Sequence, residues 1–269
     1  MPIVKANGIN MNYTERGTGE PLVLIMGLSA DGPVWEAHAA EFEKHFRCIL
    51  FDNRGVGQTD APKGSYTSEM MADDTAALMD ALNIPKAHVA GISMGGIIAQ
   101  QLAIRHPEKV QSQILTATWA KFDDYTSDVY RMLKKTRKTM SFPDFMEILQ
   151  LWIFTATHYN KNVADLKQGQ KEAPNYEFLQ TQHGFEGQAD ACISHDATAL
   201  LNQITQPTLV TAGTKDIFVP YPMSKYLHEN IKGSEMIDFE GWAHTHHWED
   251  LDKFNQSCVD FLKRNPINQ

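Results

Sequence analysis

Ser93 stands in the pattern Gly91-Ile92-Ser93-Met94-Gly95, which is typical of a serine nucleophile at a sharp turn between a strand and a helix. The pattern alone is weak evidence, because chance would produce it in roughly one chain in ten of this length. Its context is stronger, since an apolar run that includes Val89 and Ala90 leads into it and a helical stretch follows. We therefore predict that Ser93 presents a nucleophilic hydroxyl.

A serine hydroxyl reacts poorly at neutral pH, so it needs a base, and the base needs an acid that orients it. Asp216 follows the apolar run Thr208–Ala212, and His244 follows the run Met236–Phe239. Loops at the carboxyl ends of parallel strands meet at one edge of a sheet, where α/β proteins place their sites. We predict that His244 is the general base and that Asp216 orients it.

Two other histidines, His246 and His247, compete with His244 for the role of base. His244 comes first, at a turn after the small residue Ala243, whereas the other two fit the opening of the final helix. The spacing of the three histidines lacks carboxylate or cysteine companions at useful distances for a metal. The sequence therefore favours His244 and predicts no metal site.

The charge that develops on a carbonyl oxygen under attack needs hydrogen-bond donors, which are commonly backbone N–H groups. One donor should be Met94, the residue after the nucleophile. The other should come from the loop Met26-Gly27-Leu28-Ser29, which follows the first long apolar run. We predict Leu28 as the second donor of this oxyanion hole, with a plain strand-ending turn as the alternative.

The elements that position these residues alternate between strands and helices. Asn7-Gly8 predicts the turn of an opening hairpin. Continuous apolar runs are typical of strands buried on both faces, and they occur at Leu22–Met26, Cys48–Phe51, His88–Ala90, Gln113–Ala117, Thr208–Ala212 and Met236–Phe239. Helices are expected at Ser68–Leu82, at Ile97–His106 and at the C-terminus. The alternation predicts an α/β fold with a mostly parallel, twisted sheet flanked by helices.

The pattern changes over residues 120–205, where helical stretches rich in large apolar residues replace the strands. We interpret residues 120–205 as a helical cap inserted into one core made of residues 1–119 and 206–269. A separate helical domain is less favoured, because the strand pattern resumes afterwards. The candidates for a substrate pocket are Trp119, Phe145, Leu149, Trp152 and Phe218. Trp152 fits the core of the cap equally well.

With these motifs in this order, residues 1–119 and 206–269 resemble the α/β-hydrolase superfamily, most of all its capped bacterial esterases, enol-lactonases and cofactor-free haloperoxidase-like proteins. The segment Asp52-Asn53-Arg54-Gly55 resembles a structural loop of that family. The resemblance implies that its arginine bonds backbone carbonyls. Relatives with an aspartate nucleophile, namely epoxide hydrolases and haloalkane dehalogenases, are disfavoured by Ser93. The chain departs from many relatives at Met26, where they carry histidine, and at Ala243, where they carry glycine.

Composition limits the partners. The 269 residues carry a formal net charge of −9, so nucleic acid is not an expected partner. The basic run over residues 134–138 fits the solvated face of a helix. We see no targeting segment and no apolar stretch of the ~18 residues that a membrane span needs. The three widely spaced cysteines suggest reduced thiols in a cytoplasm. The oligomeric state stays open, with a homodimer as one option.

Together these residues predict acyl transfer to water. Ser93 would attack the carbonyl of a small-to-medium hydrophobic ester or lactone, form an acyl-serine and need no cofactor. Two rivals keep the same residues: a hydrolase that cleaves a carbon–carbon bond in a vinylogous diketone, and a non-catalytic ligand receptor on this scaffold. Peroxidase-like chemistry is expected only as a side reaction.

Overall fold

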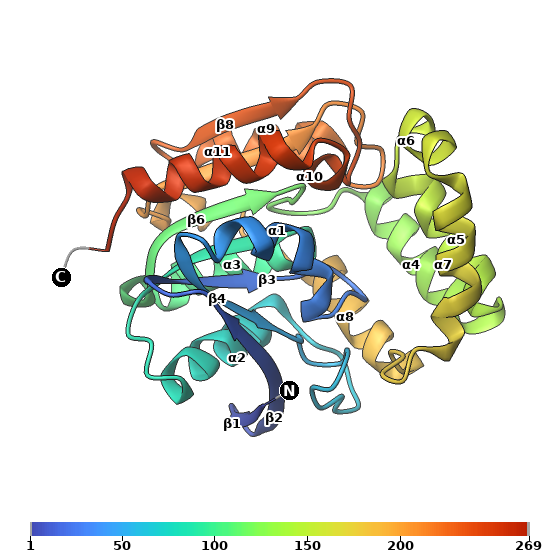
Figure 1. Cartoon of the computed structure of the whole chain (residues 1–269), viewed down its shortest axis with the longest axis horizontal. Coiled ribbons are helices and arrows are strands. Elements are labelled where there is room, and N and C mark those ends of the chain that lie inside the picture. The colour runs from blue at the N-terminus through green and yellow to red at the C-terminus, as the bar shows by residue number, and fades with distance from the viewer. Residues whose placement is uncertain (1, 268–269) are drawn as a thin grey trace.

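A computed structural model describes residues 2–267 of the chain (Figure 1). In this range eight strands form one sheet in the order β1-β2-β4-β3-β5-β6-β7-β8. Their bounds are β1 Ile3–Ala6, β2 Ile9–Arg16, β3 Glu20–Ile25, β4 Phe46–Phe51, β5 Ala87–Ile92, β6 Val110–Thr116, β7 Thr208–Gly213 and β8 Glu235–Phe239. The pairs β1–β2 and β2–β4 are antiparallel, and the other neighbouring pairs are parallel. The predicted α/β architecture is confirmed.

Helices cover both faces of the sheet, and the strands bury side chains on each face in turn. On β3, Val23 and Ile25 belong to one apolar cluster, while Leu22 and Leu24 belong to the other. The helices are α1 Glu36–Phe42, α2 Ser68–Ala81, α3 Met94–Arg105, α4 Asp124–Thr139, α5 Phe142–Ile153, α6 Ala156–Lys161, α7 Val163–Glu172, α8 Gln182–Ser194, α9 Tyr221–Asn230, α10 His246–Glu249 and α11 Leu251–Arg264. Shorter 3-10 turns lie at Gly32–Trp35, Pro107–Lys109, Ala173–Asn175 and Leu201–Gln203.

Some element bounds differ from the sequence-based expectation. The helix expected from Ile97 begins at Met94, because Ser93 itself forms the turn and helical geometry starts directly after it. The apolar run over residues 148–154, whose pattern alone fits either a strand or a helix, lies mostly in helix α5. His246 and His247 open a separate short helix, α10, which ends before α11 begins at Leu251. The opening hairpin has the expected turn, since Asn7 and Gly8 both have positive φ, 45° and 80°.

Arg54 corrects one implication of the family resemblance. Within residues 2–267 no hydrogen bond joins its guanidinium to a backbone carbonyl; instead it pairs with the carboxylate of Asp74, with Nη2 2.6 Å from Oδ1. Both side chains are buried, and the guanidinium also lies over the ring of Tyr66. A buried guanidinium needs a counter-charge more than it needs a neutral acceptor, because carbonyl dipoles replace lost hydration less well. The carboxylate on α2 supplies it.

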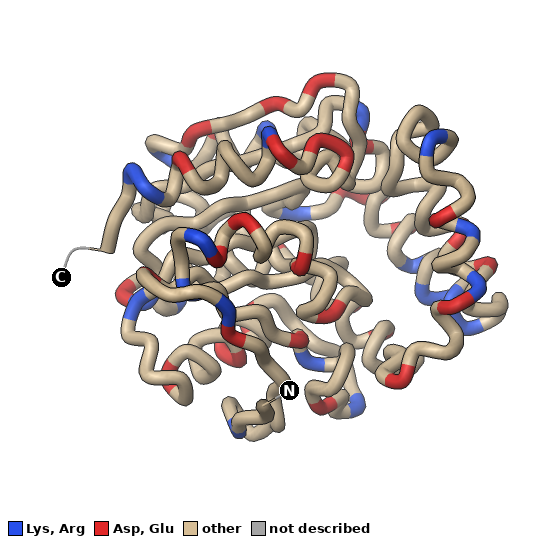
Figure 2. Tube along the Cα trace, viewed as in Figure 1, with Lys and Arg blue, Asp and Glu red and all other residues tan. Residues whose placement is uncertain are grey.

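Helices α4–α8, which we call the inserted helices, lie between β6 and β7 in the chain. Figure 1 shows α4–α7 gathered at one end of the sheet, and the arrows of β3 and β6 point toward them. Figure 2 shows acidic and basic residues intermingled on these helices. In the basic run, Lys134 pairs with Asp190 and Arg137 donates to the carbonyl of Gln180. Part of the positive charge of this run is therefore neutralised within the fold.

The buried histidines predict that the fold weakens in mild acid. Burial lowers the pKa of His38 and His195 to about 4 and that of His246 to about 3. In the unfolded chain a histidine takes up its proton near pH 6.5. As pH falls from 6.5 toward 4, the unfolded state is protonated first, so the free energy of unfolding should drop by up to about 4 kcal/mol per pH unit. Urea unfolding between pH 7.5 and pH 5 measures this slope.

A matched pair of variants separates the histidines from acidic groups that also titrate. His195→Gln should reduce the pH dependence of the free energy of unfolding by about one proton. Between pH 6.5 and 4 it removes a group that is neutral in the fold but protonated in the unfolded chain. His45→Gln alters an exposed histidine and should leave the slope unchanged. Equal slopes in the wild type and the His195 variant would show that burial does not suppress protonation at this site.

Candidate active site

Ser93 occupies the tight turn between β5 and α3. Its backbone has φ 56° and ψ −116°, a conformation that residues other than glycine rarely adopt. The turn is possible because two glycines let the backbones touch: a Cβ on Gly91 would lie 2.2 Å from the carbonyl oxygen of Gly95, and one on Gly95 would lie 2.0 Å from that of Ile25. The N–H of Ser93 also donates to the Thr116 carbonyl at 2.8 Å. The strain is thus held in place by the surrounding sheet.

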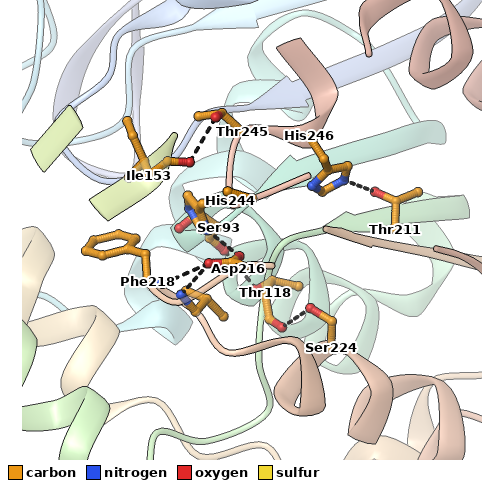
Figure 3. A network of polar contacts seen from close by, with 12 residues as sticks. Ser93, Thr118, Ile153, Thr211, Asp216, Phe218, Ser224, His244, Thr245 and His246 are labelled. Carbon is orange, nitrogen blue, oxygen red and sulfur yellow. Dashed lines mark hydrogen bonds and ion pairs between the residues drawn. The ribbon is translucent and has the colours of Figure 1, made fainter. Parts of the chain in front are cut away.

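Asp216 and His244 meet although they are far apart in the chain. His244 Nδ1 lies 2.8 Å from Asp216 Oδ2, and both residues are buried. The second carboxylate oxygen, Oδ1, accepts the backbone N–H groups of Phe218 and Val219, each at 2.9 Å. Figure 3 draws this pair together with Ser93, and a dashed line joins His244 to Asp216. A carboxylate fixed by two backbone donors favours the tautomer in which Nδ1 of the imidazole carries the proton. This tautomer leaves Nε2 of His244 free to accept a proton.

The other two histidines have different partners. His246 Nε2 contacts the Thr211 hydroxyl at 3.1 Å, and its ring is fully buried against Phe239. His247 Nδ1 contacts His38 Nε2 at 3.0 Å. The structure therefore brings Asp216 together with His244, the histidine that the sequence favours, and leaves His246 and His247 in separate contacts.

The loop after β3 lies against the nucleophile. A Cβ added to Gly27 would be 3.3 Å from Ser93 Cβ, a tight contact, so a larger residue here would push the loop and the nucleophile slightly apart. Asn53 Nδ2 holds the loop by donating to the Met26 carbonyl at 2.9 Å. Leu28 follows on this loop and borders the cavity described next. Met94 is the first residue of α3, where backbone N–H groups have no partner within the helix.

Ser93 and His244 open into one cavity of about 700 Å³ between the sheet and the inserted helices. Its wall is mostly aliphatic and aromatic. Lining residues come from the segment after β3 (Gly27, Leu28, Val34), from the inserted helices (Phe142, Phe145, Leu149, Phe185), from the connection between α7 and α8 (Phe178) and from the loop that carries Asp216 (Phe218). This is the volume of a pocket for a small organic molecule with considerable apolar surface.

Comparison with known proteins places the chain in a family. A profile described as "alpha/beta hydrolase fold" matches residues 20–251. The chain belongs to the α/β-hydrolase fold family. The crystal structure of the enol-lactonase from Burkholderia xenovorans LB400 is 27% identical, with a TM-score of 0.89 over 97% of this chain and all of that one.

Two further relatives span nearly the whole of this α/β-hydrolase. "Putative carbamate hydrolase RutD" of Pantoea ananatis is 26% identical over 93% of this chain and 90% of its own length. The structure of "Putative non-heme bromoperoxidase BpoC" from Mycobacterium tuberculosis H37Rv is 28% identical, with a TM-score of 0.86 over 96% of this chain and 97% of that one. The relatives carry different activity names, so the family assignment alone does not select a substrate.

The five residues expected in the pocket of this hydrolase divide into two groups. Phe145, Leu149 and Phe218 line the cavity. Trp119 and Trp152 are not among its lining residues. Trp119 is fully buried and stacks on Phe122, with 4.0 Å between the ring centroids. Trp152 meets the ring of Phe218 edge-on, with 6.4 Å between the centroids. Trp152 therefore packs against a residue of the wall, whereas the ring partner of Trp119, Phe122, does not line the cavity.

Sequence reasoning missed several polar residues of the cavity, namely Asp31, Tyr176, Gln180 and His247. Asp31 could have been found, since it lies three residues beyond Leu28 on the predicted oxyanion loop. Tyr176 and Gln180 had no such signal, because they follow helix α7 and reach the cavity only through the packing of the inserted helices. The loop that carries His244 is likewise tied to those helices: the hydroxyl of Thr245 donates to the Ile153 carbonyl at 2.9 Å (Figure 3).

Within residues 2–267 there is no group of three or more histidine, cysteine or acidic side chains that could hold a metal ion. In the same range no helix is both long and apolar enough to cross a membrane. All three cysteines are free and buried.

Proposed function

We propose that this α/β-hydrolase cleaves a small-to-medium hydrophobic carboxylic ester or lactone through an acyl-serine intermediate. The observation that supports this most directly is a strained Ser93 that shares a mostly apolar cavity with His244, whose Nδ1 lies 2.8 Å from Asp216. Backbone strain at a serine is expected where the hydroxyl must project into a site. A receptor that only binds ligand has no need for it.

In the proposed reaction, Ser93 Oγ attacks the carbonyl carbon while Nε2 of His244 takes the hydroxyl proton. The backbone N–H groups of Leu28 and Met94 donate to the oxyanion of the tetrahedral intermediate. His244 returns the proton to the leaving alkoxide as the acyl-serine forms. A water molecule then repeats the sequence and releases the acid. Asp216 stabilises the imidazolium in both halves.

The proposal is tested by a panel of p-nitrophenyl esters with graded acyl chains and a set of lactones. We expect turnover of several esters, an initial burst of p-nitrophenol, and an acyl adduct on the peptide that contains Ser93 after rapid acid quench. The panel includes carbamate esters because of the names of the relatives. Turnover of a vinylogous diketone without ester turnover would favour the carbon–carbon hydrolase, and binding without any turnover would favour the receptor.

We further propose that residues 120–205 act as a cap that sets substrate range. Leu149 lines the cavity from α5, so Leu149→Trp should fill part of it. Excluding about three methylenes of an acyl chain is expected to lower kcat/KM roughly fiftyfold for octanoate, with little effect on acetate. The measurement is the ratio of kcat/KM for the two p-nitrophenyl esters.

The matched control is Leu151→Trp, since Leu151 lies on the same helix but is 55% exposed and is not a lining residue. Its octanoate-to-acetate ratio should equal that of the wild type. A ratio unchanged in both variants would place the acyl chain elsewhere.

A cytoplasmic location and a homodimer stay predictions.

A further inference from the structure

The polar groups of the cavity have an unusual balance of charge. Among its lining residues none is lysine or arginine, whereas two, Asp31 and Glu172, are acidic. An apolar cavity screens charge poorly, so a carboxylate on its wall acts strongly on a bound ligand. The cavity should therefore repel an anionic substrate.

Asp31 is the acid that matters most, because it is only 9% exposed and lies on the loop that approaches Ser93. Its Oδ2 accepts the hydroxyl of Tyr176, which comes from the far side of the cavity. Burial raises the pKa of Asp31, as expected for a carboxyl group with few partners. The backbone N–H of Asp31 itself also acts on the carboxylate, and within residues 2–267 Tyr176 is the side chain that donates to it.

His247 adds a second acceptor to the same wall. Nδ1 of His38 lies 2.7 Å from Asn255 Oδ1, which makes it a donor and leaves Nε2 of His38 as an acceptor. Nε2 of His38 then accepts a hydrogen bond from the Nδ1–H of His247, and the two nitrogens are 3.0 Å apart. Nε2 of His247 is left with a lone pair rather than a proton. Burial holds the pKa of His247 well below its usual range, so the ring supplies no positive charge.

Arg137 is a cation close to the cavity, but it stands behind the wall. Its guanidinium lies over the ring of Phe142 at 4.6 Å and that of Phe145 at 5.7 Å, and both rings line the cavity. It donates to the Gln180 carbonyl at 3.0 Å. The aromatic rings thus separate this charge from the interior.

From this arrangement we propose that the hydrolase takes uncharged or cationic substrates rather than anionic ones, and that Asp31 determines this specificity. The carboxylate would accept a hydrogen bond from a hydroxyl group or from an amide or carbamate N–H of the substrate, or would pair with its ammonium group. An ester with a free carboxylate on its acyl chain would be excluded. This inference rests on the proposed ester hydrolysis and names the class of substrate for the same site.

The test compares p-nitrophenyl hexanoate with its analogues that end in a carboxylate, the hemiadipate, and in a trimethylammonium group. For the wild type, kcat/KM should be at least about tenfold lower for the hemiadipate than for hexanoate, and the ammonium ester should equal or exceed hexanoate. In Asp31→Asn, which keeps an acceptor for Tyr176, the hexanoate-to-hemiadipate ratio should move toward one by about tenfold, and any preference for the ammonium ester over hexanoate should shrink. Glu177→Gln removes the same charge from an exposed, non-lining position and should leave both ratios within about twofold.

Two results would overturn the inference: unchanged ratios in Asp31→Asn, or a wild-type preference for the hemiadipate. Loss of that preference in Arg137→Met would show that the guanidinium reaches the cavity. If none of the esters is hydrolysed, the proposed function fails and selectivity is read from binding alone. Calorimetry with hexyltrimethylammonium and with hexanoate should then still show binding of the cation only, and binding of hexanoate would reject the inference separately.

Discussion

Replacing Ser93 with alanine is expected to lower kcat/KM for ester hydrolysis by at least about 10³-fold while the fold stays intact. Without the hydroxyl no acyl-serine can form, and only the oxyanion donors and substrate binding remain to assist attack by water. The substitution keeps Cβ, so the backbone at φ 56° carries the same strain in both proteins. Stopped-flow assays of p-nitrophenyl butyrate should show neither a burst nor an adduct on the peptide that contains residue 93.

Ser29→Ala is the matched control, because Ser29 lines the same cavity but lies on the oxyanion loop rather than at the strand–helix turn. Its hydroxyl has no base beside it in the proposed mechanism, so activity should stay within about tenfold of the wild type. Circular dichroism and thermal unfolding establish that both variants are folded. A folded Ser93→Ala protein with wild-type turnover would remove the serine mechanism altogether.

The sheet and the Ser93 turn could be predicted from the sequence because their signals are local. A run such as Leu22–Ile25 is apolar at every position since both faces of the strand are covered, and this reads directly as a buried strand. The glycines around Ser93 are required by contacts within the turn and with the next strand. Asp216 and His244 could be predicted as site residues because the carboxyl ends of parallel strands converge at one edge of the sheet.

The cavity wall could not be predicted because it depends on how helices far apart in sequence pack. Trp119 and Leu149 are both large and apolar, yet one is sealed in the core and the other borders the cavity. Residue type sets the gain from burial but not the direction in which a side chain faces. The partner of Arg54 was missed for a related reason: Asp74 lies on helix α2, and nothing in the local sequence connects the two.

Replacing Asp216 with asparagine should lower kcat/KM by up to about 10⁴-fold although the loop keeps its shape. An asparagine Oδ1 can still accept the N–H groups of Phe218 and Val219 that Oδ1 of Asp216 accepts now. This places the amide Nδ2 toward His244 Nδ1, at the position of Oδ2. Since the amide nitrogen donates, Nδ1 must become the acceptor and the proton moves to Nε2. The base then presents a proton, not a lone pair, to Ser93, and the imidazolium loses its counter-charge.

The Asp216 prediction is checked by kcat/KM for p-nitrophenyl butyrate together with thermal unfolding, beside the control Asp238→Asn. Asp238 is exposed on strand β8, so its variant removes the same charge outside the site and should keep full activity. An Asp216→Asn protein that is folded and retains more than about a tenth of the wild-type rate would mean that the carboxylate only anchors its loop. A loss equal to that of Ser93→Ala would instead show that the two residues act as one unit, because groups that serve the same step do not contribute additively.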